Sequence, residues 1–390
     1  MLLRKRYKRI GVSYNDLIKQ HLEILKNLQY ESGLFAASKK GSTTGYDKPW
    51  LRDNFYECLA FDVLKDYQIV KKTYRAILRI FEKHEHKIDY AIAAKPQYRH
   101  QYIHARHHPV TFDEFWEDWG NKQNDSIGAI LFEIGRLYKK GVKVLETEKD
   151  FEIMQKLVDY LSTLEYWHDE DSGMWEEDEE VHASSIGACV AGLLAVSGIP
   201  QIIVAPELIR HGFGALNRIL PRESKRKFVD LALLSLIYPY NIVTREQALE
   251  ILDNVEYHLV KNRGVIRYKG DRYYNKNPDG YSEEAEWTMG FSFLAIIYKQ
   301  LADRELKEYG RTKSYLVYKT KYLGYERLAL KTVNEKGEIP EAYFSNSLKY
   351  NENSPLGWAE SLFVVAIYQI NKKHIFSLKR KRVVKVGVKN

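Results

Sequence analysis

Apolar residues recur at intervals of three and four along most of this chain, which is the spacing of one face of an α-helix. Leu17, Leu22, Leu25 and Leu28 form one such stripe, and Ser13 before them is a residue type that caps helix starts. The pattern predicts twelve helices, at residues 14–29, 51–64, 67–83, 123–140, 149–164, 182–197, 201–219, 224–236, 244–260, 283–303, 306–330 and 355–371. Few segments alternate as strands do, and residues 264–274 are the best candidate for a small β-hairpin.

The connections between these helices alternate in length. Breaks after the even-numbered helices are short, at 65–66, 141–148, 197–200, 238–243 and 303–305. Most other breaks are long, at 30–50, 84–122, 165–181, 261–282 and 331–354, and 220–223 is the exception. Helices joined by short turns are antiparallel neighbours. If six such pairs close into a ring, an all-α (α/α)6 barrel results, with its long loops and a central pocket at one end. An irregular helical array with scattered loops is the alternative.

Composition fits a soluble globular protein and excludes some other classes. Of the 390 residues, 45% are hydrophobic and 29% are charged, which rules out disorder or a disulfide scaffold as overall descriptions. No apolar run approaches the roughly 20 residues of a membrane span, and no leader peptide is apparent. The chain has only two cysteines, Cys58 and Cys189, which suits a reducing compartment. We therefore expect a cytoplasmic protein with no membrane association.

The net charge of +8 is concentrated at the two ends of the chain. Residues 1–10 hold five Lys and Arg, and residues 372–390 hold eight, without an acidic residue in either segment. The rest of the chain carries 47 basic against 52 acidic residues. A nucleic-acid enzyme would carry basic residues on its body, so no nucleic-acid partner is expected. We interpret residues 1–12 and 372–390 as basic tails around a single domain at 13–371, with weak RNA or anionic-membrane contact as the lesser option.

Tryptophan and carboxylate residues occur together in the long loops, just before every second helix. The clusters are Trp50–Asp53, Trp119–Asp125, Gly173–Glu177, Glu283–Trp287, and Pro340-Glu341 followed by Gly357–Glu360. An aromatic face can stack on a sugar ring, charged groups can bind its hydroxyls, and two carboxyl groups can cleave a glycosidic bond. Acidic residues also cap helix starts, but five clusters, each with a tryptophan, favour a carbohydrate site.

These segments carry a resemblance to a known family. SGLFAAS, Gly45-Tyr46, PWLRDNFYECLAF, WGNKQND, SGMWEE and the Pro340-Glu341 region resemble segments of family-15 glycoside hydrolases, the glucoamylases. A closer likeness is to the glucoamylase-like domain of phosphorylase kinase alpha and beta regulatory subunits, through YIHAR, EVHASSIG, ILPRESKRKFVDLALLS and GVIRYKGDRYY. The resemblance covers about residues 13–371. It implies the (α/α)6 barrel, the six-hairpin glycosidase architecture, that loop alternation suggests separately.

The resemblance also implies roles for individual residues. Glu176 corresponds to the general acid and Glu341 to the general base of an inverting, exo-acting α-glucosidase, whose carboxyl groups stand ~6.5–9.5 Å apart. Arg52 and Asp53 correspond to residues that grip the terminal glucose. Further substrate-binding positions are Trp50, His104, Arg106, Trp119, Gln123, Asp125, Trp175, Glu177, Arg267, Glu284, Trp287 and Trp358. Lys269 departs from the family pattern, which has two adjacent acids in this region.

Three other interpretations concern cofactors and function. Histidines cluster at 84, 86, 100, 104, 107 and 108, but their spacing fits no zinc signature. No phosphate-binding glycine motif is present either. No cofactor or metal is therefore expected.

The substrate is expected to be a soluble α-glucan or gluco-oligosaccharide. A non-catalytic sugar-binding or regulatory protein is the main alternative, and hydrolysis of trehalose or an α-1,6-glucan is another; the sequence does not indicate an oligomeric state.

Overall fold

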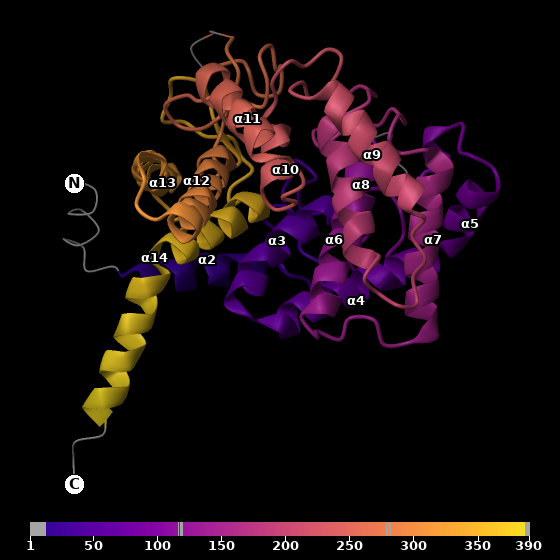
Figure 1. Ribbon diagram of the computed structural model, residues 1–390, viewed down its shortest axis with the longest axis horizontal. Helices are drawn as coiled ribbons and strands as arrows, with labels where there is room; N and C mark the ends of the chain where they lie inside the picture. Colours follow the sequence, from indigo (N-terminus) through magenta and orange to yellow (C-terminus); the bar gives the residue numbers. More distant parts are fainter. Residues whose placement is uncertain (1–12, 116, 118–119, 278–279, 281, 387–390) are drawn as a thin grey trace.

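Six helices form a closed inner ring. The computed structural model describes residues 13–115, 117, 120–277, 280 and 282–386. Within that part, the inner helices contact one another in the circular order α3, α6, α8, α10, α12, α14 and back to α3 (Figure 1). Their bounds are Leu51–Leu64 (α3), Asn124–Lys139 (α6), Ala183–Val196 (α8), Leu234–Ile237 (α10), Met289–Tyr309 (α12) and Gly357–Val386 (α14).

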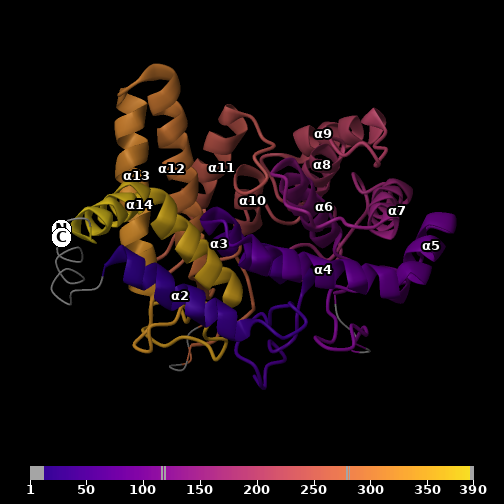
Figure 2. The same ribbon diagram turned by 90° about the horizontal axis from the view of Figure 1, so that it is seen from below.

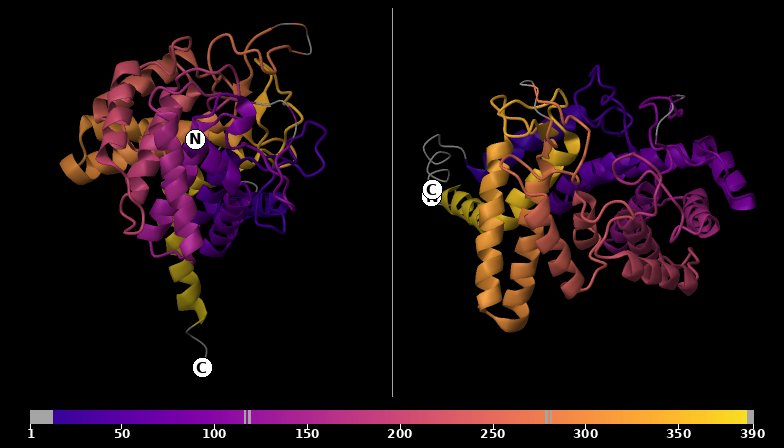
Figure 3. Two further views of the ribbon diagram at one scale, coloured as in Figure 1. Left: turned by 90° about the vertical axis from the view of Figure 1, so that its right-hand side faces the viewer. Right: turned by 90° about the horizontal axis from the view of Figure 1, so that it is seen from above.

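Five inner helices pack against the outer helix that follows them in the sequence, and the last inner helix, α14, packs against the first described helix, α2. The pairs are α3 with α4, α6 with α7, α8 with α9, α10 with α11, α12 with α13, and α14 with α2. The outer helices are α2 (Tyr14–Leu28), α4 (Tyr67–Lys83), α7 (Glu148–Leu164), α9 (Pro206–Ile219), α11 (Arg245–His258) and α13 (Lys313–Thr332). This arrangement confirms the predicted (α/α)6 barrel. The long loops gather along one edge of the molecule, which is the lower edge of Figure 2 and the upper edge of the right panel of Figure 3.

Burial distinguishes the inner from the outer helices. In α3 every residue from Leu51 to Asp62 is buried, because other helices surround it on all sides. In α4 the buried side chains follow the helical repeat, as at Val70, Tyr74, Ile77 and Phe81, and the opposite face is in solvent. The amphipathic repeat is therefore strongest in the outer helices, whereas the inner helices are buried over nearly their whole circumference.

Two glycines let inner helices α6 and α8 approach closely. A Cβ atom on Gly128 would lie 2.4 Å from the backbone carbon of Ala188, and one on Gly192 would lie 2.5 Å from the carbonyl oxygen of Gly128. Distances this short exclude any side chain. The backbones of α6 and α8 are therefore in direct contact at this point of the ring.

Aromatic side chains fill the centre of the ring. Phe55 stacks on Tyr240 with ring centroids 6.0 Å apart, and Phe132 meets Tyr240 edge-on at 5.1 Å. Tyr56 contacts Phe293 edge-on at 6.0 Å. All five side chains are buried. The barrel is consequently a packed core and not an open channel.

Three predicted helices begin or end at other places. The predicted break at 303–305 lies inside α12, and the chain turns instead at Gly310, which has a φ of +81°, before Thr312 caps α13. The predicted helix at 224–236 is reduced to a 3₁₀ turn (Leu231–Leu233) and α10. Its first residues stay in a loop because Arg226 and Lys227 pair with acidic residues from another loop. Two short helices were not predicted, α5 (Glu85–Ala93) and a 3₁₀ turn at Arg99–Gln101.

The expected β-hairpin at 264–274 is not formed. These residues make turns and one bridge residue, Val265, which pairs with Val260 and Trp287. The described sheet is instead a two-stranded antiparallel pair of β1 (Glu286–Trp287) and β2 (Ala342–Tyr343). This pair ties the loop before α12 to the loop before α14, which delays the start of α12 to Met289, six residues later than predicted.

Helix α14 continues without interruption to Val386, so it includes most of the segment 372–390 that the sequence sets apart as a basic tail. It extends away from the barrel as a single helix (Figure 1). The predicted tail at 1–12 lies outside the described residues. Among the described residues, we find no helix with the length and apolar character needed to cross a membrane.

Candidate functional site

A cavity of about 1420 Å³ opens where the inner helices begin. Its lining comes from the first residues of α3 and α14 and from the loops that precede α8, α10 and α12. Below it lie the aromatic rings that fill the barrel, so the cavity is closed at its inner end. Ten of the predicted site residues line it, namely Trp50, Arg52, Asp53, Trp175, Glu176, Glu177, Arg267, Trp287, Glu341 and Trp358.

Glu176 is held on a tight turn in the loop before α8. Asp171 and Glu180 pair across the base of this loop, and the N–H of Gly173 donates to the Asp171 carboxylate at 3.2 Å. Glu176 itself has a φ of +61°, a left-handed conformation that costs a residue with a side chain about 1–2 kcal/mol. Arg52 and the Gln123 amide each donate to Glu176 Oε1 at 2.9 Å. The turn and these two donors fix the carboxyl group at the cavity wall.

Arg52 is positioned from beneath the cavity floor. Its Nη1 donates to Gln123 Oε1 at 2.9 Å and to Asp125 Oδ2 at 3.2 Å, while its Nη2 reaches Glu176. Gln123 precedes α6 and Asp125 lies in its first turn. Neither residue lines the cavity. The expected substrate-binding residues Gln123 and Asp125 thus lie behind the cavity wall, where both contact Arg52 and Gln123 also contacts Glu176.

Asp53 lies close to both predicted catalytic carboxyl groups. Burial raises its pKa to about 7, Arg52 opposes this increase, and the negative charges of Glu176 and Glu341 add to it. Asp53 is on the first turn of α3 and lines the cavity. Because the charges of both Glu176 and Glu341 raise the pKa of Asp53, these two residues lie near each other in the fold although they are distant in the sequence.

Glu341 also lines the cavity and is buried just before β2. The amides of Asn351 and Asn353 donate to its Oε2 at 2.5 and 2.9 Å, and the Tyr273 hydroxyl donates to the same oxygen at 3.1 Å. The hydroxyl of Tyr46 lies 2.9 Å from that of Tyr273. Burial raises the pKa of Glu341, and the hydrogen bonds from Asn353 and Asn351 offset part of the increase. The arrangement suits a carboxylate that accepts a proton from a water.

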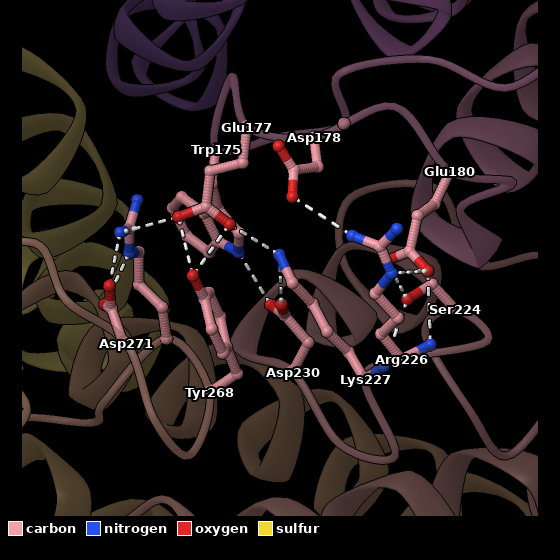
Figure 4. A network of polar contacts seen from close by, with 12 residues as sticks. Trp175, Glu177, Asp178, Glu180, Ser224, Arg226, Lys227, Asp230, Tyr268 and Asp271 are labelled. Carbon is pink, nitrogen blue, oxygen red and sulfur yellow. Dashed lines mark hydrogen bonds and ion pairs between the residues drawn. The ribbon is translucent and has the colours of Figure 1, made fainter.

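Three tryptophan rings line the same cavity as the two carboxyl groups. Trp175 lies 5.3 Å from Trp287 and stacks on Trp358 at 6.2 Å, and Trp358 in turn stacks on Tyr56 at 4.0 Å. The Trp175 indole N–H donates to Asp230 Oδ1 at 2.7 Å (Figure 4). These rings offer flat apolar surfaces next to charged groups, which is the composition of a sugar-binding pocket.

Glu177 points into a network of cations (Figure 4). It accepts hydrogen bonds from Lys227 at 2.7 Å, from Tyr268 at 2.7 Å and from Arg267 at 2.9 Å. Arg267 is also bound by Asp271 through two hydrogen bonds of 2.6 and 2.7 Å. Arg267 is therefore shared between Asp271 and Glu177, and the exposed Lys269 also lines the cavity.

Besides Gln123 and Asp125, three more predicted substrate-binding residues are not part of the cavity wall. Arg106 supports Trp50 from behind, with its guanidinium 5.3 Å from the ring, and pairs with Glu117 at 2.8 Å. His104 accepts a hydrogen bond from the backbone N–H of Arg106, and burial lowers its pKa to about 4. Glu284 accepts from the N–H of Gly270. Trp119 lies outside the described residues. No group of His, Cys, Asp or Glu in the described residues has the arrangement of a metal site.

Sequence reasoning missed the residues that surround Glu341. Tyr46, Tyr273, Asn351 and Asn353 come from three loops. Tyr46 stands in a segment that was already singled out, after Gly45, and Asn351 and Asn353 form an Asn-x-Asn pair before α14. Their alternation in a loop that follows a candidate catalytic acid was the available signal. The sequence does not point to Lys227 and Asp230, because their segment fits a helical repeat.

Comparison with known proteins gives a consistent result. The model of the family described as "Glycosyl hydrolases family 15" matches residues 12–288. The phosphorylase b kinase regulatory subunit alpha, skeletal muscle isoform, of Rattus norvegicus is 27% identical and aligns with 70% of this chain and 25% of its own length. The probable regulatory subunit alpha of Caenorhabditis elegans is 25% identical over 64% of this chain and 23% of its own length. The chain thus spans about a quarter of these relatives.

Solved structures share the fold over almost the whole chain. The structure of a wild-type glycosidase has a TM-score of 0.74 at 17% identity, and the match covers 92% of this chain and 97% of the glycosidase. A glutamate-to-alanine variant of that glycosidase, in complex with glucose, aligns equally well. The glucoamylase from Saccharomycopsis fibuligera has a TM-score of 0.66 at 15% identity and covers 92% and 95% of the two chains.

Proposed function

Because this chain belongs to glycosyl hydrolase family 15, we propose that it is an inverting, exo-acting α-glucosidase of the glucoamylase type. The substrate would be a soluble α-glucan or gluco-oligosaccharide. The observation that carries the proposal is that Glu176 and Glu341 line one cavity, where the negative charges of both raise the pKa of Asp53.

In the proposed reaction, Glu176 is the general acid and Glu341 is the general base. Glu176 gives its proton to the glycosidic oxygen while the bond from that oxygen to the anomeric carbon breaks. A water on the opposite face bonds to the anomeric carbon and loses a proton to Glu341. Attack from the opposite face inverts the configuration, so the first product is β-glucose. Arg52 keeps Glu176 in place, and Asn351, Asn353 and Tyr273 keep Glu341 in place.

The closed inner end of the cavity supports exo-action. The aromatic rings of Phe55, Phe132 and Tyr240 fill the barrel, which would leave a glucan no through passage and only a chain end to insert. Asp53 and Arg52 at the floor are suited to bind hydroxyls of the terminal glucose. Trp175, Trp287 and Trp358 would stack against the apolar faces of the sugar rings.

A second candidate is a sugar-binding regulatory protein without turnover. It is favoured by the names of the curated relatives, which are regulatory subunits of phosphorylase b kinase. The retained pair of carboxyl groups supports the enzyme instead, because a binding protein has no need for an acid and a base on the same cavity wall.

The test measures glucose release from maltose, maltotriose, isomaltose, dextran and trehalose. We expect wild-type turnover of at least one of them and a loss of roughly 10²–10⁴-fold in Glu176→Gln and in Glu341→Gln. Glu335→Gln, an exposed glutamate outside the cavity, is the matched control and should retain activity. Proton NMR of the first-formed anomer should show β-glucose, and an initial α-glucose signal would contradict inversion. Oligosaccharide binding without turnover by the wild type would favour the regulatory protein.

A further inference from the structure

A second cavity of about 640 Å³ lies beside the first. It is formed by the loop after α7, the end of α9 and the start of the loop that leads to α10. Glu180 and Arg226 line both cavities. The two spaces therefore meet at a ridge made by these two side chains.

The ridge is built from the acidic loop that carries Glu176 and the basic loop after α9 (Figure 4). Arg226 Nη1 donates to Asp178 at 3.0 Å, and Ser224 donates to Glu180 at 2.8 Å. Arg226 is 67% exposed, so its guanidinium lies over the ridge within reach of a ligand that crosses it. Glu180 is buried beneath and fixes the position of the two loops.

Tryptophan side chains line both cavities. Of the five tryptophans in the described residues, Trp50, Trp175, Trp287 and Trp358 line the first cavity, and Trp167 lines the second. Trp167 is half-buried and packs on His211 with ring centroids 4.6 Å apart. Apolar side chains from α8 and α9 form the floor, and Glu170 and Arg218 supply exposed polar groups at the rim. An aromatic platform with an apolar floor and a few polar groups suits a sugar ring.

We propose that the cavity at Trp167 is an outer subsite that binds the distal glucose units of a long gluco-oligosaccharide whose terminal unit occupies the first cavity. This inference rests on the proposed function and adds a preference for long chains to it. A chain leaving the first cavity would cross Arg226 and stack on the Trp167 ring. A disaccharide is held in the first cavity and does not reach the second.

The test compares short and long substrates in Trp167→Ala and Trp167→Phe. In Trp167→Ala we expect the KM for maltoheptaose to rise about five- to tenfold, while kcat/KM for maltose stays within about twofold. Trp167→Phe retains an aromatic face and should keep most of the wild-type KM. Tyr309→Ala removes an exposed aromatic at the far end of α12 and is the matched control.

Each outcome separates the outer subsite from the proposed hydrolysis. An unchanged KM for maltoheptaose, or an equal loss on maltose and maltoheptaose, would overturn the subsite and leave the glucosidase in place. If the wild type hydrolyses no glucoside, calorimetric titration with maltoheptaose replaces the kinetics. Weaker binding by Trp167→Ala than by the wild type and Trp167→Phe would then support the subsite, and equal binding would overturn it.

Discussion

Arg52 Nη2 donates a 2.9 Å hydrogen bond to Glu176 Oε1, although 124 residues separate the two in the chain. The same guanidinium contacts Gln123 and Asp125 through its other terminal nitrogen. Arg52 is thus a planar bridge that fixes Glu176 relative to the floor of the cavity. Lysine cannot replace it, because one ammonium group cannot reach all three partners in this geometry.

We therefore predict that Arg52→Lys lowers kcat/KM for the best glucoside by roughly 10²-fold, since a misplacement of about 1 Å at a catalytic group has that effect. Thermal unfolding should show that the variant is folded. Arg304→Lys, which changes an exposed arginine paired with Asn241, should have wild-type kinetics. Wild-type kcat/KM in Arg52→Lys would show that the bridge does not position Glu176.

The environment of Glu341 predicts a shift in the pH profile. Burial raises its pKa, and the hydrogen bonds from Asn353 and Asn351 lower it because they stabilise the carboxylate. Glu341 must be ionised to accept a proton, so kcat/KM should fall as the pH drops through its pKa. In Asn351→Ala one stabilising bond is lost, and the acidic limb should move to higher pH by about half to one unit.

The control for that shift is Asn346→Ala, because Asn346 donates to Glu283 and makes no contact with Glu341. Its profile of kcat/KM against pH should match the wild type. An acidic limb that stays in place in Asn351→Ala would separate the limb from ionisation of Glu341.

The sequence predicts a site residue when that residue belongs to a short motif next to a helix start. It does not predict a residue that joins the site only through contacts with distant segments. Glu176, Arg52 and Trp358 stand in short motifs next to helix starts, and the alternation of loop lengths brings those starts to one end of a ring. Asn351 and Tyr273 could not be found in this way, since they meet at Glu341 only in three dimensions. The basic residues at 225–227 fit a helical pattern locally, but their pairing with Glu177 and Asp178 outweighs helix propensity.

Asp53 predicts a dependence of stability on pH. Its pKa is about 7 in the fold, against an ordinary value of 3.8. Between these values the folded protein holds a proton that the unfolded chain has released, so stability decreases as the pH rises, by up to about 1.4 kcal/mol per pH unit. Asp53→Asn removes the titrating carboxyl group and therefore this decrease in stability with rising pH. In urea unfolding, the variant should be more stable than the wild type at pH 8, with a difference that shrinks toward pH 4. A difference that does not vary with pH would refute this assignment.

Two glycine substitutions should have opposite effects on stability, one at the close contact of α6 and α8 and one on the open face of α13. In Gly128→Ala the added methyl group would press on the backbone of Ala188, which should destabilise the protein by about 1–3 kcal/mol. In Gly324→Ala, on α13, nothing lies within 4 Å of the new Cβ, so the higher helix propensity of alanine should stabilise by up to about 1 kcal/mol. Midpoints of chemical unfolding measure both, and two shifts of the same sign would disprove the packing argument.

Helix α14 begins at the cavity with Gly357 and continues to Val386, far outside the ring. An α-helix rises ~1.5 Å per residue, so this one element is about 45 Å long. Its first turn holds Trp358 against the substrate space, and its last turns stand clear of every loop that surrounds the cavity mouth. A reporter or affinity handle joined to the far end of α14 would leave the mouth of the cavity open, so this end is the place to immobilise the protein for binding and turnover measurements.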